Sequence, residues 1–318
     1  AKDIQADTAS MLTFKCPGCG AEVTINTANA MTARCHWCRH VLGVNEQIPN
    51  GAVPDAVLSF HIKKDDAVAR IRQFVGKRQL FALKEFKEQF TPENVIGVYL
   101  PYMIVDGNVS ADVAGQGEIE TRRYERGSDN NKTTYYDADV YRLSRHVDFT
   151  VDDLPLESSA TRGNLDARVN TNNIINAILP FDTKNAVKWN ASYLAGFSSE
   201  KRDLNVEGLR PRLEDELLSL ARAAVEASVK RYDRGVRWEQ EHLEVHGTRW
   251  VSMYLPVWLY SYHQPGSNGG MLHYIAVNGR TGQTMGSVPV QQWKLLLTAL
   301  TVGTFLETIA LWIVGHSS

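Results

Sequence analysis

The placement of the four cysteines constrains this 318-residue chain more than any other feature of its sequence. Cys16, Cys19, Cys35 and Cys38 form two Cys-x-x-Cys pairs with 15 residues between them, a spacing typical of four-cysteine zinc sites. Each pair can turn two sulfurs toward one ion, and four thiolates leave no open position for water or substrate. We therefore expect one structural Zn²⁺, with a redox-active Cys-x-x-Cys pair and an iron–sulfur site as the alternatives.

Residues 11–45 are expected to fold around that ion as a zinc ribbon. Gly18 and Gly20 give the backbone freedom that the first tight turn needs. A segment of this length cannot bury enough apolar surface to fold alone, so metal binding would supply its folding free energy. With four sulfurs available, His36 and His40 are expected to face solvent rather than bind the ion.

The charge balance argues against a general nucleic-acid-binding protein. The net charge is −2, from 34 basic and 36 acidic residues, so no long-range field attracts a polyanion. Near the cysteines, Lys15, Arg34 and Arg39 are too few to form a basic stripe, although Trp37 and Phe14 could stack on bases. Contact with proteins is expected ahead of contact with nucleic acid, which stays open as an alternative.

The rest of the chain predicts an α+β fold, in which 43% hydrophobic residues allow a sizeable core. Apolar spacing and end signals predict helices over 65–76, 83–90 and 211–234, and strands over 95–105 and 109–151. The expected segments are a polar tail at 1–10, the zinc ribbon at 11–45, a linker at 46–56, an α+β domain at 57–290 and a transmembrane anchor at 291–318.

Two of these helices carry more detailed expectations. Asp65 or Asp66 is expected to cap the first helix. Pro211 is expected in the first turn of the helix over 211–234, and Gly235 stops it. One apolar stripe is expected along that helix, formed by Leu213, Leu217, Leu220, Ala224 and Tyr232.

Two similar segments of the sequence suggest a duplicated helix-plus-sheet unit, over 57–150 and 205–290. Residues 98–105 begin Val-Tyr-Leu-Pro and residues 253–260 begin Met-Tyr-Leu-Pro, each after a helix and a polar connection. Coincidence between two strands is the alternative. Five residues of these two segments are expected in the core: Tyr99, Pro101, Tyr254, Pro256 and Trp258.

The C-terminal segment predicts a membrane anchor. Leu295–Val314 carries one charge, Glu307, and as a helix would span about 30 Å, the thickness of a bilayer core. Trp293 and Trp312 lie near its two ends, and Lys294 precedes it, which would keep the bulk of the chain in the cytoplasm. We expect a single-pass protein of the cytoplasmic membrane; a buried or amphipathic helix of a soluble protein is the alternative.

One face of that helix is expected to pack against another helix. Ala299, Gly303 and Glu307 recur every four residues and therefore share a face. Small residues let a partner helix approach closely, and a carboxylate at that depth should face protein rather than lipid. The partner helix would belong to a second copy of the chain or to a different subunit.

Searches for catalytic motifs fail. The sequence contains no Gly-x-x-x-x-Gly-Lys-Ser/Thr phosphate loop and no Gly-x-Ser-x-Gly nucleophile elbow. Asp152 and Asp153 resemble a carboxylate pair but are better explained as a turn. His242, Glu244 and His246 alternate along an expected strand, whose polar face could be simply exposed or could hold a metal.

Several segments together resemble a family of bacterial zinc-ribbon membrane proteins, with a rubredoxin-like ribbon, that are often labelled primosomal or helicase-like. The resemblance implies a cytoplasmic zinc-ribbon module tethered by C-terminal transmembrane helices, in some members beside phage-shock-type membrane-stress proteins. It implies no catalytic residues. The matching segments are Cys16–Gly20, Cys35–Cys38, Gly97–Tyr102, Tyr193–Phe197, Tyr254–Trp258 and Ala276–Gly282.

The sequence therefore predicts a non-enzymatic, membrane-anchored adaptor that recruits or assembles partner proteins at the cytoplasmic membrane face. The partners would be the membrane itself and other membrane-associated proteins, in a homo- or hetero-oligomer, in a response to membrane stress. The alternatives are a nucleic-acid-binding zinc-ribbon protein and an enzyme of unrecognised type.

Overall fold

A computed structural model describes residues 11–27, 33–42, 47–78, 81–127, 132–160, 177–264 and 271–316 of the chain. The predicted polar tail at 1–10 and most of the loop at 127–132 lie outside this range. The described residues form mostly β-sheet with few helices, and the four cysteines lie together, so the coarse features of the predicted fold class are confirmed.

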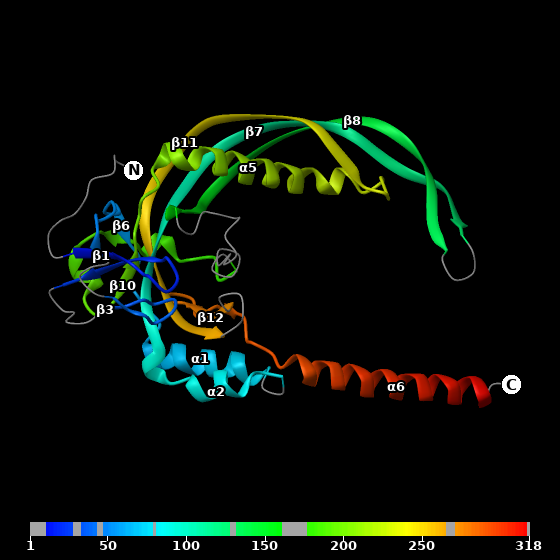
Figure 1. Ribbon diagram of the computed structural model, residues 1–318. Coiled ribbons are helices and arrows are strands. Elements are labelled where there is room, and N and C mark those ends of the chain that lie inside the picture. Colours follow the sequence, from blue (N-terminus) through cyan, green and yellow to red (C-terminus); the bar gives the residue numbers. More distant parts are fainter. Residues whose placement is uncertain are drawn as a thin grey trace. The chain divides into compact units, whose positions relative to one another are not determined.

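The chain divides into two compact units (Figure 1). Among the described residues, unit 1 consists of Tyr102–Ser158 and Leu204–Ser252, and unit 2 consists of 11–101, 159–203 and 253–316. Two long strands, β7 (Val95–Arg126) and β11 (Val236–Gln264), run through both. Each unit is thus assembled from separate stretches of chain. The domain boundaries that the sequence predicts, from the polar tail to the C-terminal anchor, stay a prediction.

Unit 2 contains a mixed sheet in which the strands of the cysteine-rich segment are full members. Strand β2 pairs antiparallel with β10, and β10 pairs parallel with the first part of β7. The order along the sheet is β13 (Thr284–Gly286), β12 (Met271–Asn278), β11, β7, β10 (Ser198–Glu200), β2 (Glu22–Asn26), β1 (Met11–Lys15) and β5 (Gln47–Ile48). The cysteine-rich segment is therefore continuous with the sheet of unit 2.

Shorter elements complete unit 2. Strands β3 and β4 form a separate two-stranded hairpin, while β6 pairs with β11 and β9. The bounds are β3 (Ala33–Arg34), β4 (Val41–Leu42), β6 (Ala56–Val57), β9 (Val187–Lys188) and the 3-10 turns η2 (Pro92–Asn94), η3 (Thr183–Asn185) and η4 (Ala191–Leu194).

Helices α1 (Lys64–Gly76) and α2 (Lys84–Gln89) confirm the two helices predicted in this region. Ala67, Val68 and Ile71 of α1 recur at helical spacing and are buried in one cluster with residues of β11 and β12. The predicted aspartate cap is wrong, because Lys63 takes the N-cap position without a side-chain hydrogen bond. The two aspartates lie in the first turn, where they complement the helix dipole.

The two similar segments, 98–105 and 253–260, lie on the neighbouring strands β7 and β11. The rings of Tyr99 and Tyr254 stack with centroids 6.2 Å apart. All five residues of these segments that were predicted to lie in the core are buried, which confirms the predicted core positions. The duplication itself stays a prediction, since adjacent strands share similar packing demands.

Unit 1 is built on a long hairpin. β7 pairs antiparallel with β8 (Thr133–Glu157) from Tyr102↔Glu157 to Arg126↔Thr133, and β11 lies on the other side of β7. Helix α5 (Val206–Val229) covers one face of these strands (Figure 1). The turn predicted at Asp152 and Asp153 is wrong, because both residues lie within β8, beside an irregularity in its pairing with β7.

Helix α5 begins earlier than the sequence predicts. Asn205 caps it by accepting a hydrogen bond from the N–H of Gly208, so Pro211 lies inside the helix rather than in its first turn. The predicted stripe is right at Leu213 and Leu217 but wrong at Leu220 and Ala224, which face solvent. Tyr232 is buried, but it lies beyond the end of α5 at Val229, so the predicted stop at Gly235 is wrong. The buried positions instead recur strictly every four residues: Leu209, Leu213, Leu217, Ala221, Val225 and Val229.

The C-terminal segment forms helix α6 (Gln292–His316), which confirms a helix over the predicted 295–314. Its large apolar side chains are exposed as far as the structure describes them. Within the described residues, no helix combines the length and the apolar character that crossing a membrane requires.

Candidate metal centre

The two Cys-x-x-Cys pairs adopt the same backbone turn at two places in the chain. The N–H of Gly20 donates to the carbonyl of Cys16 at 2.8 Å, and the N–H of Arg39 donates to the carbonyl of Cys35 at 2.8 Å. The residue that follows each pair has positive φ, 77° at Gly20 and 63° at Arg39. The first turn uses the predicted glycine, whereas the second holds a non-glycine residue in the left-handed region.

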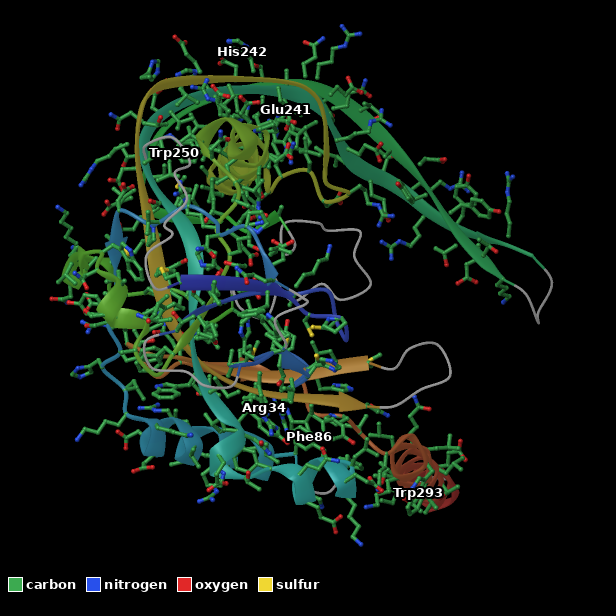
Figure 2. All side chains as sticks on the ribbon, turned by 60° about the vertical axis from the view of Figure 1, so that its left-hand side comes forward. Arg34, Phe86, Glu241, His242, Trp250 and Trp293 are labelled. Atoms are coloured by element: carbon green, nitrogen blue, oxygen red, sulfur yellow. The ribbon has the colours of Figure 1, made fainter. Side chains whose placement is uncertain are left out.

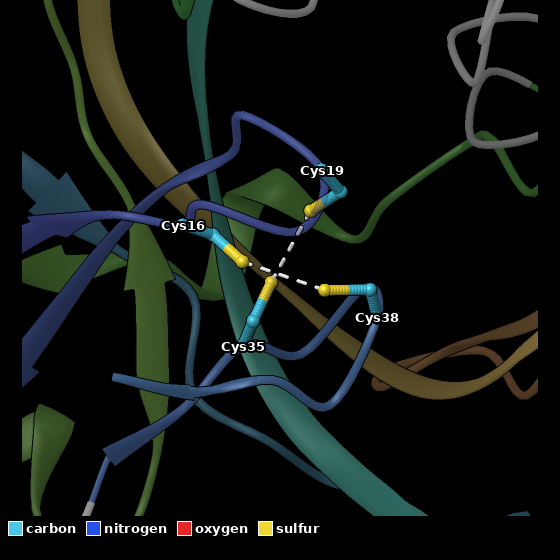
Figure 3. Close-up of side chains that lie close together, drawn as sticks. All are labelled: Cys16, Cys19, Cys35 and Cys38. Carbon is cyan, nitrogen blue, oxygen red and sulfur yellow. Dashed lines mark hydrogen bonds between the residues drawn. The ribbon is translucent and has the colours of Figure 1, made fainter. Parts of the chain in front are cut away.

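The four sulfurs converge from these two turns (Figure 3). Cys16 Sγ lies 3.4 Å from Cys38 Sγ, and Cys19 Sγ lies 3.5 Å from Cys35 Sγ. All four sulfurs lie within 4.8 Å of one another, and none forms a disulfide. A tetrahedral zinc site with Zn–S bonds of about 2.3 Å needs sulfurs slightly under 4 Å apart. The cluster can therefore hold one metal ion and is compatible with zinc.

The four thiols shift one another's pKa values. The pKa of Cys19 is raised to about 12, because its hydrogen bond with Cys35, which lowers the pKa, is outweighed by that with Cys38 and by burial. The hydrogen bonds with Cys19 and Cys38 raise the pKa of Cys35, while those with Cys19 and Cys35 lower the pKa of Cys38. Thiols this close do not all ionise together unless a cation balances their charge.

The second turn is buried in unit 2, contrary to expectation. His36 and Trp37 are each 1% exposed, so the predicted solvent exposure of His36 is wrong, while His40 is exposed as predicted. Trp37 and Phe14 are both buried and are not free to stack on bases. The aromatic support for a nucleic-acid-binding ribbon is thereby removed.

Glu200 of β10 is the residue that fixes this turn, and sequence reasoning missed it. Its carboxylate, 1% exposed, accepts a hydrogen bond from the indole N–H of Trp37 and lies 3.3 Å from His36 Nε2. Ser159 Oγ donates to its other oxygen at 3.4 Å, and Ser198 Oγ lies 3.2 Å from His36 Nδ1. A buried carboxylate needs such partners, so this network couples the metal-ligand turn to β10.

Arg39 adds a second attachment. Its guanidinium donates to the carbonyl of Ser261 and lies 5.0 Å from the ring centroid of Tyr260, both on β11. Ser261 Oγ also donates to the carbonyl of His36 at 3.0 Å. These contacts explain why an arginine occupies a left-handed position that favours glycine.

Two substitutions of Arg39 distinguish the cost of its strained backbone from the stability that its contacts with β11 provide. In Arg39→Ala the contacts with β11 are lost and the strain is kept, whereas Arg39→Gly loses the contacts but relieves about 1 kcal/mol of strain. We expect Arg39→Gly to be the more stable of the two by that amount in urea unfolding. The matched control is Gly20→Ala, which should cost about 1 kcal/mol in the other turn. Equal stability of the two Arg39 variants would contradict the assignment.

Outside the cysteines, a second group of potential ligands lies in unit 1. The carboxylates of Asp106, Asp152 and Asp153 lie within 4.8 Å of one another. Asp106 accepts the backbone N–H of Asp153 at 2.9 Å and pairs with Arg249 at 3.5 Å. These contacts explain why the three carboxylates lie together: Asp106 binds the backbone of β8 at the point where the pairing of β7 with β8 is irregular.

The predicted packing face of α6 is open in unit 2. Ala299 and Glu307 are exposed, and a Cβ placed on Gly303 would meet no atom within 4 Å. Whether a partner helix covers this face stays a prediction.

Comparison with known proteins places few limits on these assignments. No protein-family model and no solved structure matches the chain. The chain is similar to "Uncharacterized protein YdjG" of Bacillus subtilis (strain 168), with 23% identity over 263 residues, which cover 82% of this chain and 72% of that protein. Most of the chain therefore has a counterpart in a protein whose printed name gives no activity.

Proposed function

We propose that this chain is a non-enzymatic adaptor, attached to a membrane through α6, that recruits partner proteins, and that one structural Zn²⁺ holds Cys16, Cys19, Cys35 and Cys38 together. Four sulfur ligands suit zinc and complete its tetrahedral shell, so the centre supports structure rather than chemistry. The resemblance of the sequence to zinc-ribbon membrane proteins supports partners among membrane-stress proteins.

The exposed apolar surface of α6 is the observation that carries membrane attachment. Leu296 is 64% exposed, Trp293 60% and Leu300 60%, and Leu297 and Val302 are also more than half exposed. A run of large apolar side chains uncovered by its own chain marks an interaction surface. Transfer of one such leucine from water into an apolar phase is worth roughly 1.5 kcal/mol or more.

The threonines of α6 also suit an apolar environment. Thr298 Oγ1 donates to the carbonyl of Lys294 at 2.8 Å, and Thr304 Oγ1 donates to the carbonyl of Leu300 at 2.9 Å. Thr301 Oγ1 does the same to Thr298 at 3.0 Å. Hydroxyls that are satisfied within their own helix cost little to remove from water, so these threonines do not oppose burial in lipid.

The far end of the β7–β8 hairpin offers a surface for protein partners. Tyr135, Tyr136 and Tyr141 are each more than 40% exposed. Tyr135 stacks on Tyr124 with centroids 6.0 Å apart, and the Arg126 guanidinium lies 5.3 Å from the Tyr124 centroid. Exposed tyrosines and arginines are enriched in protein interfaces, which supports recruitment through this hairpin.

Membrane attachment is tested by charging the surface of α6. In the double variant Leu296→Glu with Leu300→Glu, loss of two apolar contacts should weaken binding to lipid vesicles by about 100-fold or more. Vesicle co-sedimentation of the purified full chain measures this. The matched control is Leu220→Glu on α5, an exposed leucine outside α6. An unchanged pellet fraction for the double variant would exclude α6 as the attachment.

A further inference from the structure

The face of the unit 1 sheet that α5 leaves uncovered gathers histidines and carboxylates from three strands. In Figure 2 Glu241 of β11 lies on the side of α5, where it pairs with Arg222, and His242 lies on the other side. The open face therefore carries the alternating residues that the sequence singled out on β11. Its side chains in contact are Ser110 and Asp112 of β7, His146 and Asp148 of β8, and Glu244 and His246 of β11.

A continuous series of short contacts crosses this face. His146 Nε2 lies 3.4 Å from Asp148 Oδ1. Ser110 Oγ lies 2.6 Å from the same oxygen and 2.6 Å from His246 Nε2. One carboxylate oxygen thus lies beside the Nε2 of His146, and the Ser110 hydroxyl connects the same oxygen to the Nε2 of His246 on another strand.

The second ring nitrogen of each histidine faces another carboxylate. His146 Nδ1 lies 2.8 Å from Asp112 Oδ1, and His246 Nδ1 lies 3.8 Å from Glu244 Oε1. Histidines that bind metal through one ring nitrogen commonly present the other to a carboxylate, which fixes the tautomer and strengthens the ligand. The contact with Asp112 therefore orients His146 with its Nε2 toward Asp148, whereas the Nε2 of His246 faces Ser110.

We propose that His146, Asp148 and His246 bind a second Zn²⁺ on this face. Two tetrahedral ligands, each about 2.1 Å from zinc, lie about 3.4 Å from each other, which matches the separation of His146 Nε2 and Asp148 Oδ1. His246 becomes the third ligand when its ring turns from Ser110 toward the ion. All three side chains are about half exposed or more, so this rotation meets no packed core.

Imidazole and carboxylate ligands suit zinc, and a water completes the shell. With three protein ligands at the surface, the site binds more weakly than the four-cysteine centre and exchanges its ion with solvent. The alternation of His242, Glu244 and His246 alone does not define this site, because its other two ligands, His146 and Asp148, lie on β8.

The test adds Zn²⁺ to the full chain after its cysteine centre has been loaded with one equivalent. Calorimetry should detect one further equivalent, and either His146→Ala or His246→Ala should weaken it at least tenfold. Asp112→Asn, which removes a carboxylate that orients His146, should weaken it by about tenfold while leaving one further equivalent. Circular dichroism of each variant confirms that the sheet is intact.

Two controls separate a built site from general surface binding. His61→Ala removes an exposed histidine of unit 2 and should leave the further equivalent unchanged. Ser110→Ala should retain binding, because Ser110 holds His246 but is not a ligand. The proposal is overturned if the loaded chain takes up no further zinc, if binding survives both histidine variants, or if His61→Ala abolishes it. None of these outcomes depends on membrane attachment.

Discussion

Removing the metal from the cysteine centre should lower the unfolding temperature of the unit 2 sheet by about 8–16 °C, and should not merely loosen the cysteine turns. The second turn lies in the core, where Trp37 and His36 contact Glu200 of β10 and Trp37 packs edge-on against Tyr274 of β12, with ring centroids 5.3 Å apart. Without the ion the four thiols lose their common centre, and we expect a cost of about 4 kcal/mol, with each kcal/mol worth about 2–4 °C.

The measurement is thermal unfolding by circular dichroism, with and without a strong chelator, followed by restoration of Zn²⁺. Cys35→Ser should reproduce the loss in the presence of zinc, because Cys35 is a buried member of the four-sulfur cluster. The control is His40→Ala, which removes an exposed side chain next to the centre. Identical melting of the chelated and zinc-loaded chains would show that the centre does not support the sheet.

The metal centre is the part of this molecule that its sequence predicts best, because its determinants are local. Two turns of four residues each bring their own sulfurs together, and the turn geometry repeats at Gly20 and Arg39. The position of the centre in the fold is not local. Glu200 meets Trp37 across 163 residues of chain, and no periodicity around Glu200 distinguishes a buried carboxylate from an exposed one.

The length of the strands is a second feature that the sequence alone does not predict. The sequence predicts a strand over 95–105 and β structure over 109–151, but β7 is one strand of 32 residues that passes from unit 2 into unit 1. Burial along β7 is continuous where both faces are covered and alternates where only α5 covers it. The change of burial pattern marks a change of surroundings along one strand, and the sequence alone does not join 95–105 to the β segment that follows it.

Helix ends and open faces were the least predictable. Pro211 suits a first turn, yet Asn205 provides the stronger cap, and α5 starts five residues earlier than predicted. On the open face of unit 1, the residues of β11 could be grouped from their alternation alone. Their neighbours on β7 and β8 could not be named, since cross-strand register depends on the whole sheet.

Replacing Trp37 should be the most damaging single substitution that leaves all four sulfurs in place. Trp37 is 1% exposed, its indole N–H donates to Glu200, and its ring packs on Tyr274. Trp37→Ala leaves a cavity and removes a donor from a buried carboxylate, and we expect a loss of about 4 kcal/mol in the free energy of unfolding. Trp37→Phe keeps most of the packing and should lose about 1–3 kcal/mol.

Chemical unfolding with metal analysis by mass spectrometry tests this prediction. Zinc content per chain should be the same in every variant as in the unchanged protein, because Trp37 is not among the proposed ligands. A stability loss would then report on docking and not on metal loss. Trp293→Ala is the matched control: Trp293 is 60% exposed on α6 and should cost less than about 0.5 kcal/mol. If Trp37→Ala cost as little as Trp293→Ala, the cysteine turns would be an independent module. A large loss at unchanged zinc content would instead show that the cysteine turns and the sheet are joined through a tryptophan that does not bind the ion.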